Sequence, residues 1–216
     1  MEETENAGIN DADAALWNRR TDEILDAAAI LFAERGYDGA DTQELACRLN
    51  VGKGTLYRYF PSKRQLFLAA ADRAMRRLRE HLDVVTARSH DPLEQVAAAI
   101  EAFLSFFDEY PQYAELLILE RALFRDRTKP TYMEHREKNL ARWETLYKSL
   151  IQAGRVRPIP VDRITAGISD LVYGTMFSNH IAGRKKPLGK QADDIVDIVF
   201  FGILSESERV SRREDQ

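Results

Sequence analysis

The chain has 216 residues, of which 44% are hydrophobic and 31% charged, with a formal net charge of −4 and a pI near 5.7. This composition is that of a globular protein with room for one sizeable core and a small second unit. No apolar run approaches the roughly 20 residues that a membrane-spanning helix needs, and the acidic N-terminus does not resemble a secretory signal. Because Cys47 is the one cysteine, an internal disulfide framework is excluded, and we expect a cytoplasmic protein without membrane contact.

Proline, glycine and capping residues divide the chain into a series of predicted helices. Residues 1–15 are expected to form a disordered tail, and a helix over about 17–35 ends at Gly36. Further helices are predicted over about 42–49, 53–59, 63–86, 92–109, 111–125, 130–153, 161–183 and 190–207. No alternating pattern of useful length predicts a β-strand. The sequence therefore predicts an all-α fold of about nine helices.

Two short helices joined by a tight turn form the most informative stretch of the chain. Thr42 is expected to cap the first helix, and Asn50 and Gly52 end it, since Asn and Gly tolerate a left-handed turn. The second helix, 53–59, stops before Pro61. This is the pattern of a helix-turn-helix, whose second helix can enter the major groove of DNA. Although the whole chain is acidic, this stretch places five bases against Glu44: Arg48, Lys53, Arg58, Lys63 and Arg64.

Two further phrases stand out, FAERGY at 32–37 and VGKGTLYRYFPSK at 51–63, with Thr42 between them. Through these phrases, residues 19–66 resemble the DNA-binding domain of the TetR family of bacterial transcriptional regulators. Three positions depart from the family pattern, where Ala, Gly and Ser are commoner: Leu49, Asn50 and Gly52. The motif has many fixed positions and covers less than a quarter of the chain.

The resemblance implies a TetR-type DNA-binding domain at 16–65 and a larger helical ligand-binding and dimerisation domain at 66–210. It also implies a homodimer that binds a palindromic operator in double-stranded DNA and responds to a small-molecule effector. Gly54 lets the backbone approach closely, and the implied phosphate contacts are Thr42, Lys53, Tyr59 and Lys63. The candidate base contacts are Thr55, Tyr57 and Arg58. The Arg58 guanidinium can bind guanine through two hydrogen bonds, and a phosphate or solvent-facing role stays open.

Large apolar residues in the second domain have two interpretations. Helical bundles need a core, and aromatic residues at a spacing of three or four usually supply it. The same groups can line a cavity for an apolar or aromatic ligand, which Tyr and His side chains would orient. The candidate ligand-binding residues are Phe103, Phe107, Tyr110, Trp143, Tyr147, Tyr173, Phe177 and His180.

Broad apolar stripes mark the last two predicted helices. Gly167 and Gly174 lie seven residues apart and would allow another helix to approach closely. The TetR resemblance implies that these two helices pair with their copies in a four-helix dimer interface, while packing inside the monomer is the alternative. The candidate interface residues are Ile164, Ile168, Ile195, Val199, Phe200 and Ile203.

The sequence carries no motif that predicts an enzyme. The four histidines, His81, His90, His135 and His180, lack metal-ligand spacing, and no nucleophile elbow, phosphate loop or dinucleotide fingerprint occurs. Cys47 is interpreted as a small buried hydrophobe, with a redox sensor as the alternative.

We therefore predict a dimeric DNA-binding regulator, with no catalytic residue, metal or cofactor. It is expected to be a repressor that a small hydrophobic or aromatic effector releases from its operator. The alternative is a helical DNA-binding protein that has no small-molecule effector and is controlled by a protein partner.

Overall fold

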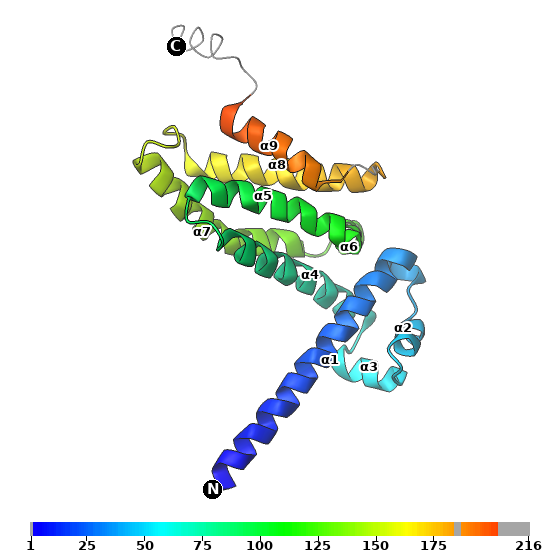
Figure 1. The fold of residues 1–216 in the computed structure, drawn as a ribbon. Coiled ribbons are helices and arrows are strands. Elements are labelled where there is room, and N and C mark those ends of the chain that lie inside the picture. Colours follow the sequence, from blue (N-terminus) through cyan, green and yellow to red (C-terminus); the bar gives the residue numbers. More distant parts are fainter. Residues whose placement is uncertain (1, 184–186, 203–216) are drawn as a thin grey trace. The chain divides into compact units, whose positions relative to one another are not determined.

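The computed structural model describes residues 2–183 and 187–202, with side chains from residue 13 onward (Figure 1). Within these ranges all regular structure is helical, which confirms the predicted fold class. The described residues form nine helices: α1 (Glu2–Gly39), α2 (Thr42–Arg48), α3 (Lys53–Tyr59), α4 (Lys63–Thr86), α5 (Pro92–Glu109), α6 (Pro111–Leu123), α7 (Thr131–Gln152), α8 (Val161–Ile181) and α9 (Gly189–Phe201). None of these helices combines the length and apolar character needed to cross a membrane.

Helix α1 begins at Glu2, so helix occupies the stretch in which the sequence predicts a disordered tail. Ala14 and Ala15, just before Leu16, favour helix. The regular helix stops at Gly36, as predicted, where φ is 67° and ψ is 174°. Glycine accepts this conformation at little cost, so Gly36 turns the chain toward α2.

The helices pack into two compact units that differ from a simple division along the sequence. The first unit contains Met1–Arg77 and Gln112–Arg136, and the second contains Leu78–Pro111 and Glu137–Gln216. The first unit thus includes the expected DNA-binding domain together with α6 and the first residues of α7. The chain passes from one unit to the other within α4, at the start of α6, and within α7.

The core of the first unit is built from residues that are no more than 2% exposed: Ile24, Leu31, Phe32, Leu45, Leu56, Leu66 and Phe67. Phe124, just after α6, joins this core because its ring packs edge-on against Phe67 and Tyr37, with centroids 5.3 and 5.2 Å away. The helix-turn-helix therefore packs on an apolar core to which Phe124, the residue after α6, contributes.

In the second unit, α5 packs against α8 and α9. Helix α5 begins as predicted, with Pro92 at its first position, and Asp91 Oδ1 accepts hydrogen bonds from the Leu93 and Glu94 N–H groups. The Asn179 and Gln191 side-chain amides exchange two hydrogen bonds of 3.2 Å, which join α8 to α9.

Candidate nucleic-acid interface

Helix α2 is capped by Asp41, so the predicted Thr42 cap is wrong by one residue. Asp41 has an extended backbone, and its Oδ1 accepts a hydrogen bond of 2.8 Å from the Gln43 N–H. Asp and Thr are both good caps, so sequence alone does not choose between neighbours. Thr42 is instead 8% exposed, and its Oγ1 lies 3.2 Å from the Tyr57 hydroxyl. This contact joins α2 to α3.

The turn between α2 and α3 is a left-handed helix end. Asn50 has a φ of 52°, which confirms the prediction that this residue makes the turn. The Val51 N–H donates to the Ala46 carbonyl at 2.9 Å, and the Asn50 N–H donates to the Cys47 carbonyl at 3.1 Å. These two bonds form a Schellman motif, which satisfies carbonyls that the end of α2 would leave free. The turn is therefore fixed by its own backbone.

Helix α3 buries one side chain and presents the others. Leu56 is 1% exposed and anchors the helix in the core. Four of the predicted DNA contacts are exposed, namely Lys53, Gly54, Tyr57 and Arg58, while Thr55 and Tyr59 are half-buried. A Cβ atom at Gly54 would meet nothing within 4 Å, so packing inside the chain does not require glycine there.

Lys63 lies at the start of α4 and is half-buried. Its Nζ donates a hydrogen bond of 3.2 Å to the Asp38 carbonyl and lies 4.9 Å from the centre of the Tyr37 ring. The protein thus holds this ammonium in one place while leaving its charge without a carboxylate partner among the described residues.

The positive charge of the helix-turn-helix is smaller than the sequence suggests. Arg48 binds both Glu34 and Glu44, at 2.7 and 2.6 Å, and Arg64 is paired with Asp126. Glu34 and Asp126 lie outside the stretch 42–64 that holds the five bases, and within that stretch Glu44 is the one acidic residue. Of the five bases in this stretch, Lys53, Arg58 and Lys63 have no carboxylate partner among the described residues, and these three define the basic surface.

Residues 24–70 match the sequence profile described as bacterial regulatory proteins, tetR family. This stretch is a TetR-type DNA-binding domain.

The relatives of this chain include regulators of transcription. The HTH-type transcriptional activator FasR of Mycolicibacterium smegmatis is 33% identical over 100 residues, so the match spans less than half of either chain, 46% of each. The HTH-type transcriptional repressor KstR2 of Mycobacterium tuberculosis is 28% identical over 165 residues, which cover 72% of this chain and 79% of KstR2. The FadR regulator of Bacillus subtilis, solved in complex with stearoyl-CoA, shares the fold, with a TM-score of 0.71 at 19% identity over 84% of this chain and 98% of FadR.

One aromatic residue beside the TetR motif was not predicted to belong to the site. The Trp17 ring of α1 stacks on the Tyr59 ring of α3, with centroids 3.9 Å apart and planes 20° from parallel. A pattern in the sequence points to this position, because Trp17 lies seven residues before Ile24 and fourteen before Leu31, both of which are buried. Trp17 therefore lies on the same side of α1 as these core residues, although its own side chain is 45% exposed.

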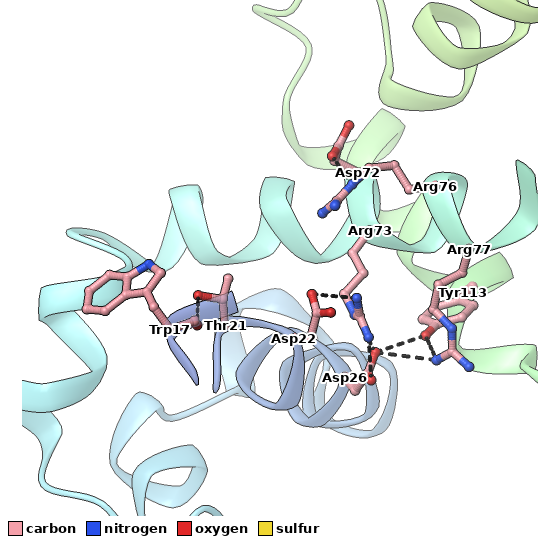
Figure 2. Close-up of polar contacts among 9 residues, drawn as sticks. All are labelled: Trp17, Thr21, Asp22, Asp26, Asp72, Arg73, Arg76, Arg77 and Tyr113. Carbon is pink, nitrogen blue, oxygen red and sulfur yellow. Dashed lines mark hydrogen bonds and ion pairs between the residues drawn. The ribbon is translucent and has the colours of Figure 1, made fainter. Parts of the chain in front are cut away.

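Within the first unit, a polar network ties α1 to α4 and α6 (Figure 2). Arg73 forms a bidentate ion pair with Asp26, in which Nε lies 2.8 Å from Oδ1 and Nη2 lies 2.9 Å from Oδ2. Arg73 also pairs with Asp22. The Tyr113 hydroxyl, from a side chain that is 1% exposed, accepts a hydrogen bond of 2.7 Å from Arg77 and donates one of 3.3 Å to Asp26. Three helices thus meet at Asp26.

The network shifts the protonation of its members. Burial opposes the charge on Asp26, but the hydrogen bonds and charge of Arg73 outweigh it and lower the pKa of that carboxyl. Burial, followed by the negative charge of Asp26, raises the pKa of Tyr113 to about 12. At neutral pH the network therefore contains a charged carboxylate and a neutral phenol.

All eight predicted ligand residues lie in the second unit, and seven of them fall into two groups. Phe103 and Phe107 of α5 have ring centroids 5.1 Å apart, and Phe103 meets Tyr173 of α8 at 4.8 Å, with Phe177 6.3 Å beyond. Tyr110 touches this aromatic cluster through a ring between them, Phe106. The second group comprises Trp143 and Tyr147 of α7, and burial raises the pKa of Tyr147. His180 is half-buried near the end of α8.

The residues predicted for the dimer interface differ in how far they are exposed. Ile195 is 6% exposed and is already buried within its own unit. Half-buried positions are Ile164, Ile168, Val199 and Phe200, while Ile203 lies outside the described residues. The most open apolar side chains of α8 and α9 are not among the candidate interface residues. They are 40 to 75% exposed and comprise Leu171, Ile181, Ile198 and Phe201. An apolar stripe in the sequence does not show which of its side chains are buried by other helices of the same chain and which stay exposed.

Two isolated reactive side chains, Cys47 and His135, lie in different environments. Cys47 is exposed on α2, so the interpretation as a buried hydrophobe is wrong; it lies on the same face as Gln43, whose amide is 3.8 Å from the sulfur. His135 is 6% exposed, and its Nε2 lies 2.8 Å from Asp72 Oδ1. Among the described residues no group of three or more His, Cys, Asp or Glu side chains is placed to hold a metal ion.

Proposed function

We propose that this chain is a dimeric, DNA-binding regulator of transcription that acts in the cytoplasm as a repressor. The observation that carries the proposal is the surface of α3. Its exposed side chains include Lys53 and Arg58, two cations without a carboxylate partner in the described residues, on a helix fixed by a self-satisfied turn. A short helix that exposes cations and is anchored by one buried leucine is suited to the major groove.

Each residue of the proposed interface has a physical role. Lys53 and Lys63 neutralise DNA phosphates, and Thr42 and Tyr59 offer hydroxyl groups to the DNA backbone. Gly54 allows the protein backbone to approach the DNA closely. Thr55, Tyr57 and Arg58 then face base edges, where a guanidinium can bind guanine bidentately. The hydrogen bond between Thr42 and Tyr57 fixes the direction in which the Tyr57 ring points.

Dimerisation is proposed through α8 and α9. Their open apolar side chains Leu171, Ile181, Ile198 and Phe201 would be covered by the second copy. A Cβ atom at Gly167 or Gly174 would meet nothing within 4 Å, so these glycines are not needed for packing inside the chain. They would let a helix of the partner approach closely. Two copies place two α3 helices in successive major grooves, about 34 Å apart or somewhat more, on a palindromic operator.

The proposed effector is a small hydrophobic or aromatic molecule that binds in the second unit. The aromatic cluster of Phe103, Phe107, Tyr173 and Phe177 supplies apolar walls, and Tyr147 supplies a hydroxyl on a largely buried side chain. The stearoyl-CoA bound to the FadR relative supports a ligand with a long apolar chain. We expect the dimer to have two conformations that differ in the spacing of the two DNA-binding units. Such a ligand releases DNA only if it binds more tightly to the conformation that does not fit the operator.

The proposal is tested by selecting duplexes from a randomised pool with the wild-type protein and measuring their affinity by fluorescence anisotropy. We expect selected sequences with two-fold symmetry, and weaker binding after addition of stearoyl-CoA or another long-chain acyl compound. Failure to enrich any sequence would contradict the regulator. Enrichment without a response to acyl, sterol or aromatic compounds would favour control by a protein partner instead. A thermal-shift screen against the same compounds reports ligand binding independently of DNA.

A further inference from the structure

Trp17 lies outside the motif that predicts DNA binding, yet it contacts the end of the helix that carries the proposed contacts. Its ring covers Tyr59 at a centroid distance of 3.9 Å, and the Arg58 guanidinium lies 5.8 Å from the centre of the same Tyr59 ring. Tyr59 is the last residue of α3, and at Phe60 the backbone becomes extended, with φ of −134° and ψ of 98°. Tyr59 therefore has a helical residue before it and an extended residue after it, so the helix constrains its surroundings on one side only.

The backbone that carries Trp17 is fixed against the helix-turn-helix. The Arg20 guanidinium donates a hydrogen bond of 3.1 Å to the Leu49 carbonyl, at the end of α2, and pairs with Glu23 at 2.7 Å. One turn of helix separates Arg20 from Trp17. The indole is thus held at a set position relative to both helices, and it forms a platform that exists before DNA arrives.

The Tyr59 hydroxyl has no hydrogen bond to another described residue. Its orientation therefore depends on ring packing, and the closest described ring is that of Trp17. A side chain that is mobile in the free protein must be ordered when it binds, which lowers affinity, whereas a side chain held in its bound orientation avoids that cost.

We infer that Trp17 is a positioning residue of the DNA-binding surface, whose indole holds the Tyr59 ring in the orientation in which the hydroxyl meets the phosphate backbone. This inference rests on the proposed DNA binding. Trp17 is 45% exposed, so the indole is not part of the buried core. Its effect on DNA is exerted through Tyr59.

The test uses full-length protein and a duplex that the wild type has selected from a randomised pool. Trp17→Ala is expected to weaken binding by about three- to tenfold, the range expected for losing one aromatic pair. Trp17→Phe retains a ring and should restore binding to within about twofold. Leu16→Ala is the matched control, because Leu16 directly precedes Trp17 in α1 and is 66% exposed. The melting temperature of each variant is measured, and Trp17→Leu replaces Trp17→Ala if the latter is unfolded.

A double-mutant cycle separates positioning from a direct contact. In a Tyr59→Ala background, Trp17→Ala should have no further effect on affinity, since there is no ring left to position. The salt dependence of binding should not change, because no charge is removed. An equal effect in both backgrounds, or Trp17→Ala binding as tightly as Leu16→Ala, overturns the inference. If the wild type selects no duplex at all, the proposed function fails instead.

Discussion

Two contacts between helices, one in each compact unit, use different chemistry. In the first unit, charged and hydrogen-bonded side chains connect separate helices, with Asp26, Arg73 and Tyr113 joining α1, α4 and α6. In the second unit, α5 meets α8 through rings such as those of Phe103 and Tyr173. A two-pronged ion pair has one favourable geometry, whereas stacked and edge-on rings tolerate sliding at small cost.

This difference suits the tasks proposed for the two units, DNA binding for the first and effector binding for the second. A DNA-binding surface must present its side chains in one arrangement, so a network with fixed directions supports it. A region that accepts an apolar effector must adapt its walls to the ligand, and contacts without fixed direction permit this. The comparison predicts that polar substitutions in the first unit and apolar ones in the second have unlike consequences for DNA and effector binding.

The largest expected effect comes from the open face of α8 and α9, which belongs to the second unit. Phe201, 60% exposed, contributes to this face, and Phe201→Glu would place a charge in the proposed dimer interface. We expect a helical monomer whose operator affinity falls by about 100-fold or more, because the two DNA-binding units no longer act together. Sedimentation gives the mass. Val84→Glu is the control, since Val84 is also exposed, at 59%, but lies on α4. A Phe201→Glu protein of dimeric mass would exclude this face.

The next largest effect concerns a buried carboxylate in the first unit. Glu120 is 1% exposed, and its Oε1 accepts hydrogen bonds from Arg127 at 2.6 Å and from the Thr131 N–H and hydroxyl at 2.9 Å. Glu120→Ala leaves these donors without their acceptor, so we expect a loss of about 3 kcal/mol in the free energy of unfolding. Arg121→Ala, exposed on the same helix, should change it by less than about 0.5 kcal/mol. Urea unfolding measures both.

Glu120→Gln tests whether the free energy of unfolding depends more on the accepting oxygen of Glu120 or on the charge of its carboxylate. The second oxygen of Glu120, Oε2, is buried and has no hydrogen-bond partner among the described residues. An amide keeps the accepting oxygen, so the loss should be well below that of Glu120→Ala. Equal losses in the two variants would mean that the carboxylate charge, and not its acceptor position, holds α6 to the start of α7.

The sequence predicted the helices well because their ends are determined locally. Pro92 and Asp91 specify the start of α5, and Gly36 and Asn50 specify left-handed ends, all from side chains next to the turn. Interactions between distant residues were not predictable in the same way. The partner of Arg64 is Asp126, 62 residues away, and no spacing rule connects them. For this reason the basic surface was overestimated from the sequence.

A third prediction compares the two buried tyrosines at alkaline pH. The pKa of Tyr113 is raised to about 12 by burial and by Asp26, and the pKa of Tyr147 is raised by burial alone. A raised pKa means that the neutral phenol is favoured in the folded state. For Tyr113 the resulting stability is fully present below about pH 10 and is lost as the pH rises toward about 12, with a maximum of about 2 to 3 kcal/mol.

Tyr113→Phe should therefore flatten part of the alkaline loss of stability, measured by urea unfolding at about pH 9 and about pH 11. Tyr147→Phe is the matched variant in the second unit and should remove a separate part, so that the double variant is flatter than either. Tyr113→Phe also removes the hydroxyl that bridges Arg77 and Asp26, so we expect it to alter the response of DNA affinity to effector, whereas Tyr147→Phe alters effector affinity. An unchanged pH dependence in Tyr113→Phe would show that this phenol does not titrate between the two values.

The candidate site shows the same division between local and distant information. The residues of α3 were predicted from the motif, and the structure exposes Lys53, Tyr57 and Arg58 on that helix. The stack of Trp17 on Tyr59 joins residues 42 positions apart in the chain, and its existence depends on how α1 packs. The aromatic residues of the second unit were identified as a set, but only packing determined that Phe103 meets Tyr173.

The smallest expected effect lies at the edge of the basic surface and concerns Lys63. Its ammonium is held by the Asp38 carbonyl and the Tyr37 ring, so its charge is fixed in place without being neutralised. Lys63→Ala should weaken binding to all duplexes alike, because a cation beside the backbone contributes no base readout. The slope of log affinity against log salt should fall by about 1 for each phosphate that is no longer neutralised. Lys190→Ala, an exposed lysine of the second unit, is the control and should leave the slope unchanged. If Lys63→Ala also leaves it unchanged, the ammonium serves only to hold the loop at Asp38, and the electrostatic part of DNA binding then rests on α3 alone.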